Sequence, residues 1–240
     1  MRTNNSILII FFLFTSFIFG QNNSGENAEL YKRARSLEQA GLVEETINLY
    51  EQLIKNDPKN NQYFNTYKRF LKNTGNQEKI SNLAYNYYQY NKKDPSAYYE
   101  WINALIMNQD ENWKSEVDIF IDRHFKNKNL MRQILYAMYS SGLSNQLKPI
   151  IERIRALTKT PSFLSRELGD INFMRMDYQS GIIEFLLYLD KNPNDFSYIS
   201  DKLMAVPAED YILNIIRNTL NKNESNHSQL LLSNIEFREK

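Results

Sequence analysis

The side chains that most often carry catalysis are sparse in this sequence of 240 residues, and those present do not have the spacing of a catalytic site. There is no cysteine, and the two histidines, His124 and His227, lie far apart without the spacing of a zinc site. We expect His124 to pack in a helix interface. The adjacent carboxylates Glu44–Glu45 and Asp110–Glu111 are expected on a wet helix face and in a turn. No glycine-rich phosphate loop or nucleophile elbow is present. We therefore predict a protein that is not an enzyme and has no cofactor or metal site.

The elements that the sequence does specify are short amphipathic helices in pairs. The first pair lies between Leu30 and Pro58, with apolar residues at intervals of three and four, as on one face of a helix. Gly41 interrupts the pattern, and we expect it to end the first helix in the left-handed conformation that glycine adopts easily. Pro58 ends the second helix. Both helices are too short to be stable alone, so each must bury its apolar stripe on a neighbour.

This pair resembles the tetratricopeptide repeat, a helix–turn–helix unit of 34 residues. Further matches follow in a second unit and, after a third unit that is the least regular and a fourth unit that follows the pattern, in a fifth. The residues that carry the resemblance are Leu30, Ala34, Leu37, Gly41, Thr46, Tyr50, Leu53 and Pro58 in the first unit, Phe64, Lys68, Leu71 and Gly75 in the second, and Leu168, Gly169, Asp177, Tyr178, Gly181, Phe185 and Pro193 in the fifth.

The resemblance implies an all-α fold, a right-handed α-solenoid of stacked antiparallel helix hairpins. We predict a turn at Asn108–Asn112, a late start for the helix around Pro149, and close helix packing at Gly169 and Gly181. A polar loop is expected over Asn221–His227. The predicted hairpins cover about 27–60, 61–95, 96–127, 128–161, 162–195 and 196–220, and 221–240 holds that loop and the start of a further repeat helix.

The N-terminal segment predicts where the protein is located in the cell. Arg2 precedes an apolar run over 7–19 that ends at Gly20, which is typical of a secretory signal peptide over residues 1–20, followed by a polar linker over 21–26. We expect an exported protein of the bacterial cell envelope, periplasmic or extracellular. The alternative is an inner-membrane anchor formed by an uncleaved segment. Without cysteine there is no lipid anchor. The net charge of +1 gives no reason to expect nucleic acid as a partner.

The resemblance also implies a concave groove lined by the first helix of each hairpin. Two arginine pairs, Arg35 with Arg69 and Arg132 with Arg166, are each one repeat apart and would suit carboxylate or phosphate groups. Alternatively, these arginines pair with acidic neighbours. We predict a non-catalytic scaffold that binds a protein or peptide; the rivals are a self-assembling or envelope-machine component and an unrecognised hydrolase. The candidate groove residues are Tyr31, Arg35, Asn65, Arg69, Lys72, Arg132, Tyr136 and Arg166.

Overall fold

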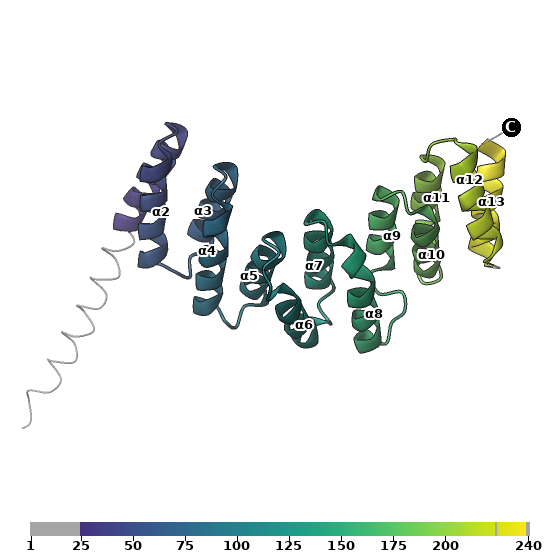
Figure 1. Cartoon of the computed structure of the whole chain (residues 1–240), viewed down its shortest axis with the longest axis horizontal. Coiled ribbons are helices and arrows are strands. Elements are labelled where there is room, and N and C mark those ends of the chain that lie inside the picture. The colour runs from purple at the N-terminus through teal and green to yellow at the C-terminus, as the bar shows by residue number, and fades with distance from the viewer. Residues whose placement is uncertain (1–24, 224, 239–240) are drawn as a thin grey trace, which may run out of the picture. The chain divides into compact units, whose positions relative to one another are not determined.

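The computed structural model describes residues 25–223 and 225–238, and all regular structure in these ranges is helical (Figure 1). The expected signal peptide and most of the linker lie outside the described residues. The fold is α-solenoid-like, in agreement with the all-α prediction. The helices fall into two compact units, an N-terminal unit that ends at Trp113 and a C-terminal unit that begins at Lys114.

In the N-terminal unit, a helix over 25–39 is followed by four labelled helices. Neighbouring helices of this unit contact one another, α2 with α3, α3 with α4 and α4 with α5. Asn60 and Asp94 begin α3 and α5 by accepting hydrogen bonds from backbone N–H groups of the first turn. The labelled helices are α2 (Val43–Asn56), α3 (Asn61–Asn73), α4 (Gln77–Tyr90) and α5 (Pro95–Met107).

In the C-terminal unit, the closest hairpin is formed by α9 and α10, and α12 contacts both α10 and α13. Short 3-10 turns over Ser144–Gln146 and Pro193–Asp195 precede two of the helices. The helices are α6 (Trp113–His124), which starts at the unit boundary, α7 (Lys128–Ser140), α8 (Leu147–Thr158), α9 (Ser165–Met174), α10 (Tyr178–Leu189), α11 (Phe196–Met204), α12 (Asp210–Asn221) and α13 (Asn226–Arg238).

Each unit has its own apolar core, built from the helix faces that the periodicity predicts. In the N-terminal unit Tyr50, Leu53 and Leu71 are fully buried. In the C-terminal unit a second cluster joins α10, α11, α12 and α13 around Phe185, Leu189 and Ile216. Burying these stripes is what stabilises helices of only nine to fifteen residues.

The first helices of successive hairpins end in the same way. The predicted left-handed conformation of Gly41 is confirmed, with φ 75°, and the N–H of Leu42 bonds to the carbonyl of Leu37 across the turn at 3.1 Å. The corresponding bond from Asp177 to Asn172 measures 2.9 Å. The left-handed residues at these helix ends are 34, 34, 33 and 34 positions apart: Gly41, Gly75, Gln109, Gly142 and Met176.

The predicted close approach at Gly169 and Gly181 is confirmed, and it has a reciprocal form. A Cβ added to Gly169 would lie 2.4 Å from the Phe185 ring of α10, and one added to Gly181 would lie 2.3 Å from the Phe173 ring of α9. Each helix therefore offers a glycine to an aromatic ring of its neighbour, and this brings the two helix backbones close together.

Other local predictions are partly right. The turn at 108–112 is present, and Pro149 stands in the first turn of α8, as the late start required. The polar loop over 221–227 is shorter than predicted, because α13 already begins at Asn226. Leu37, one of the residues that carry the resemblance, is only half-buried.

Candidate functional site

The first arginine pair of the predicted groove is bridged by a carboxylate. Arg35 donates to Glu38 at 2.7 Å, and Arg69, from the next hairpin, reaches the other oxygen of Glu38 at 3.2 Å. The hydroxyl of Tyr50 also donates to Glu38, at 2.7 Å. Burial raises the pKa of Tyr50, so this hydroxyl stays protonated and remains a donor. The structure thus brings Arg35 and Arg69 together, but around an acidic side chain, as the alternative interpretation foresaw.

The other candidates of the N-terminal unit lie nearby on the helix over 25–39 and on α3. The Tyr31 hydroxyl is 3.2 Å from the Thr66 hydroxyl, and its ring packs on that of Tyr63 with centroids 5.5 Å apart. Asn65 bonds to the carbonyl of Asn61 within α3 at 2.9 Å. Lys72 is exposed. Tyr31 therefore joins the first two hairpins, whereas Asn65 bonds only within its own helix.

In the C-terminal unit, Arg132 of α7 donates to Glu167 of α9 at 2.9 Å, and Lys128 lies 3.8 Å from the same carboxylate oxygen. Glu167 is 7% exposed, and its second oxygen is buried without a partner in the described residues. Tyr136 of α7 is half-buried, and burial together with the nearby carboxylate of Asp170 raises its pKa. Two cations therefore neutralise one buried carboxylate between consecutive first helices.

Arg166 differs from the other candidate arginines. Its guanidinium lies 4.2 Å from the centre of the Tyr198 ring of α11, and no ion pair to a carboxylate is found for it in the described part of the chain. Burial opposes its charge, but the hydroxyls of Tyr198 and Tyr188 favour it, and the pKa of Arg166 is raised. The Tyr198 hydroxyl in turn donates to Asp170, which also binds Lys202 at 2.9 Å. The stacked guanidinium keeps N–H edges for another acceptor.

Sequence reasoning missed several side chains that surround Arg132 and Arg166, among them Glu167, Tyr198 and Lys202. The hairpin over 196–220 carries none of the repeat-signature residues named above, so no local pattern indicates Tyr198 or Lys202. Arg132 and Arg166 are not joined to each other in the structure, since Arg132 binds Glu167 and Arg166 stacks on Tyr198.

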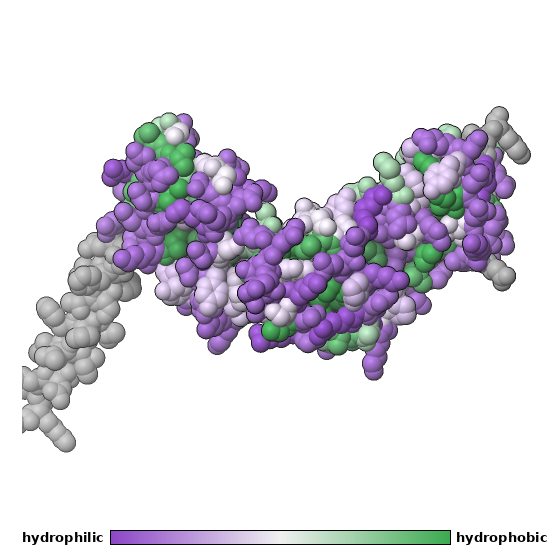
Figure 2. All heavy atoms as spheres, viewed as in Figure 1, coloured by the Kyte–Doolittle hydropathy of each residue, from purple (hydrophilic) through white to green (hydrophobic). Residues whose placement is uncertain are grey.

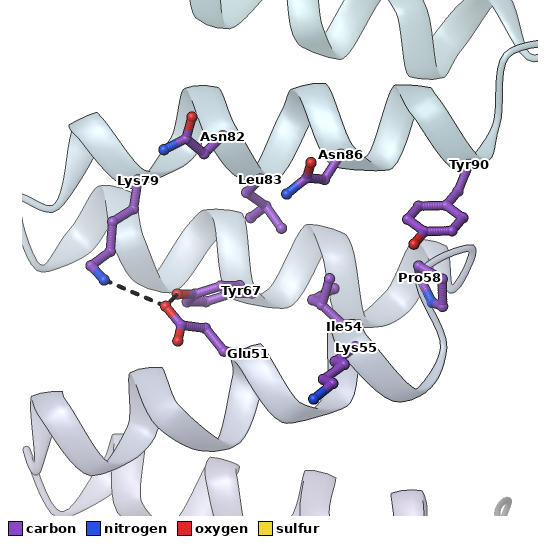
Figure 3. Close-up of a pocket in the computed structure, with 10 residues that line it drawn as sticks. All are labelled: Glu51, Ile54, Lys55, Pro58, Tyr67, Lys79, Asn82, Leu83, Asn86 and Tyr90. Carbon is purple, nitrogen blue, oxygen red and sulfur yellow. Dashed lines mark hydrogen bonds and ion pairs between the residues drawn. The ribbon is translucent and has the colours of Figure 1, made fainter.

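Two hollows of the surface lie away from these side chains, each between two second helices. A groove of about 430 Å³ separates α2 from α4 in the N-terminal unit (Figure 3). Its apolar part is formed by Ile54, Leu83 and the Tyr67 ring, and at one end Lys79 meets Glu51 at 3.4 Å. Hydrophobic residues otherwise reach the surface in small separate patches on the face drawn in Figure 2.

A second hollow, of about 380 Å³, lies between α8 and α10 in the C-terminal unit. Arg155 lies against it and makes an ion pair with Glu184 at 2.5 Å, and it also donates to the Ser165 hydroxyl at 2.8 Å. Arg175 also donates to Asn145 on the same hollow at 3.1 Å, so part of its polar lining is bonded within the hollow.

The chemistry that these surfaces offer is hydrogen bonding and charge pairing. In the described residues, no three histidine or acidic side chains come together as metal ligands. No helix within the described ranges combines the length and the apolar character needed to cross a membrane. Burial and Arg123 lower the pKa of His124, whose ring packs on that of Phe120. Comparison with known protein-family models and with curated proteins gives no match.

Proposed function

We propose that this chain is a non-catalytic scaffold that binds a protein or peptide through the first helices of stacked, tetratricopeptide-like hairpins. The regular recurrence of left-handed helix ends, at 34, 34, 33 and 34 residues, supports a repeated hairpin of that family's length. In the proposed assembly the hairpins continue in chain order as a right-handed solenoid, and repeats of this kind present a continuous binding surface. The leader-like sequence at the N-terminus supports export to the bacterial cell envelope.

The observation that carries this proposal is the state of Arg166. Arg35, Arg69 and Arg132 are already bound to carboxylates, whereas Arg166 stacks on the ring of Tyr198. Its orientation is fixed by Tyr198, so little conformational entropy is lost when it binds a ligand. A carboxylate of a partner, from a side chain or a chain end, would complete its charge pairing.

The test is a comparison of capture from envelope extracts. Residues 21–240 are immobilised as wild type, as Arg166→Ala and as Arg217→Ala. We expect Arg166→Ala to lose most of the captured partner, since loss of a charge-assisted hydrogen bond costs about 1.5–3 kcal/mol, or roughly ten- to a hundredfold in affinity. The control arginine, Arg217 of α12, hydrogen-bonds to Asn214 on the same helix and should be dispensable.

Thermal melts accompany the capture experiment, so that loss of folding is not mistaken for loss of binding. A partner retained equally by all three proteins would contradict the proposed role of Arg166. A partner lost from both variants alike would show that capture follows net charge and not this site.

Self-assembly is the second candidate, and the last two helices give a specific reason to consider it. Phe237 and Leu230 of α13 are 79% and 55% exposed, and Tyr211 of α12 is 73% exposed. Exposed apolar side chains on neighbouring helices favour association with another apolar surface. Light scattering of the chain over a concentration series distinguishes the candidates: stable oligomers without a partner favour self-assembly, and a monomer favours the scaffold.

A further inference from the structure

The groove between α2 and α4 has a row of hydrogen-bonding side chains along one rim. Asn82, Asn86 and Tyr90 follow one another at intervals of four residues on α4, and all three line the groove. Positions four apart are separated by about 6 Å along a helix. Figure 3 shows the amides of Asn82 and Asn86 turned the same way, one turn apart. Neither amide has a hydrogen-bond partner among the described residues, and both are exposed.

This spacing matches the backbone of an extended peptide. In a β-strand the residues that direct their N–H and C=O groups to the same edge recur every second residue, at about 6–7 Å. A side-chain amide has one acceptor oxygen and two donor hydrogens. Asn82 and Asn86 can therefore each bond to the N–H and C=O of one peptide residue, two positions apart, with Tyr90 next in the row.

The base of the groove fits the side chains of the same peptide residues. Residues two apart in an extended chain also direct their side chains to one face. In the α2/α4 groove that face meets Ile54, Leu83 and the ring of Tyr67, which come from three different helices. Apolar side chains at alternate positions of the peptide would be buried there, and the intervening residues would face water or α2.

The charges of the groove favour an acidic peptide. Two lysines, Lys55 and Lys79, and one glutamate, Glu51, line it. Glu51 is engaged by Lys79 at 3.4 Å and by the hydroxyl of Tyr67 at 3.2 Å. Lys55 is exposed and makes no ion pair with the described residues. A carboxylate at an intervening position of the peptide would therefore meet a lysine without a competing partner.

We propose that the α2/α4 groove binds an extended acidic peptide segment that carries apolar side chains at alternate positions. The site belongs to the second helices of two consecutive hairpins. It is independent of the first-helix face around Arg166 and would stand if that proposal failed.

The first experiment uses an end-blocked, fluorescent hexapeptide that alternates leucine and glutamate, with binding followed by anisotropy. We expect saturable binding to the wild type and about tenfold weaker binding to the Asn82→Ala/Asn86→Ala variant, which removes the amides and leaves the base intact. Asn218→Ala, which truncates an exposed asparagine of α12, should bind as the wild type does. The same peptide with lysine in place of glutamate should bind more weakly.

The second experiment tests the contact to the peptide backbone. The N–H groups of the three leucines are replaced by ester oxygens, which removes donors without changing side chains. This peptide should bind the wild type about two- to tenfold more weakly than the amide peptide, and the loss should vanish in the Asn82→Ala/Asn86→Ala variant. Esters at the glutamates keep the leucine N–H groups and only weaken the leucine carbonyls as acceptors, so their asparagine-dependent effect should be smaller.

Three results would overturn the proposal. One is the absence of saturable binding of the leucine–glutamate peptide to the wild type. Another is an ester effect that is as large in the Asn82→Ala/Asn86→Ala variant as in the wild type, because the peptide backbone would then bond to other groups. The third is concentration-dependent association of the chain that Asn86→Arg abolishes, which would assign the groove to a second copy.

Discussion

At the scale of single residues, the helix ends show that the left-handed conformation, which suits glycine best, is also adopted by residues with side chains. Three of the left-handed positions carry glycine, while Gln109 and Met176 adopt φ 50° and 61° with side chains. A side chain in this conformation costs about 1–2 kcal/mol, because Cβ approaches the following carbonyl. These positions keep the turn because the surrounding hydrogen bonds fix it.

Met176 gives the clearest prediction at this scale. It is 74% exposed, so its side chain contributes little burial, and Met176→Gly should stabilise the C-terminal unit by about 0.5–1 kcal/mol. The reverse control is Gly142→Ala, where an added Cβ would have open space around it and only the backbone strain remains. It should destabilise by about 1 kcal/mol. Urea unfolding of both variants and of the wild type measures these differences. If all three proteins were equally stable, the left-handed conformation would cost a side chain nothing at these turns.

At the scale of the element, the reciprocal glycines of α9 and α10 set how closely one hairpin closes. Helix propensity alone would favour Gly181→Leu by about 1 kcal/mol. Overpacking should win, because the new side chain would meet the Phe173 ring, and the Gly169 carbonyl lies 3.3 Å from the added Cβ. We expect a net loss of about 1–3 kcal/mol in a thermal melt.

The matched control is Gln179→Leu, which places the same side chain on the exposed face of α10 and should be near neutral. A Gly181→Leu protein that melts at or above the wild-type temperature would mean that α9 can move away at little cost.

What the sequence predicts is limited to features within one helix or one hairpin. Gly41, Pro149 and the pair Gly169 and Gly181 were predictable, because the conformation or contact at each depends on nearby residues and on helical spacing. Glu38 was different. Its contact with Arg35, three residues earlier on the same helix, follows from helical spacing, but its contact with Arg69 depends on the stacking of two hairpins, which no local pattern indicates. The α2/α4 groove was missed for the same reason, since its rim and base come from three helices.

At the scale of the whole molecule, the two cores predict local cooperativity. Leu53 and Leu189 are both fully buried, the first in the N-terminal core and the second in the C-terminal core. Replacing either with alanine should cost about 2–5 kcal/mol. We expect hydrogen exchange to accelerate mainly in the unit that carries the change, because neighbouring hairpins share each core. Acceleration of equal size in both units for both variants would show a single cooperative structure.

The regular recurrence of left-handed helix ends has a consequence for how such a chain can change in length. Removing one or two residues from a helix turns everything after them by about 100° per residue and points the apolar stripe at water. Removing or duplicating a whole period, such as the 34 positions from Gly41 to Gly75, returns every stripe and turn to its former orientation. The architecture can therefore grow or shrink by complete hairpins, while a deletion inside a helix changes the face that every later turn presents.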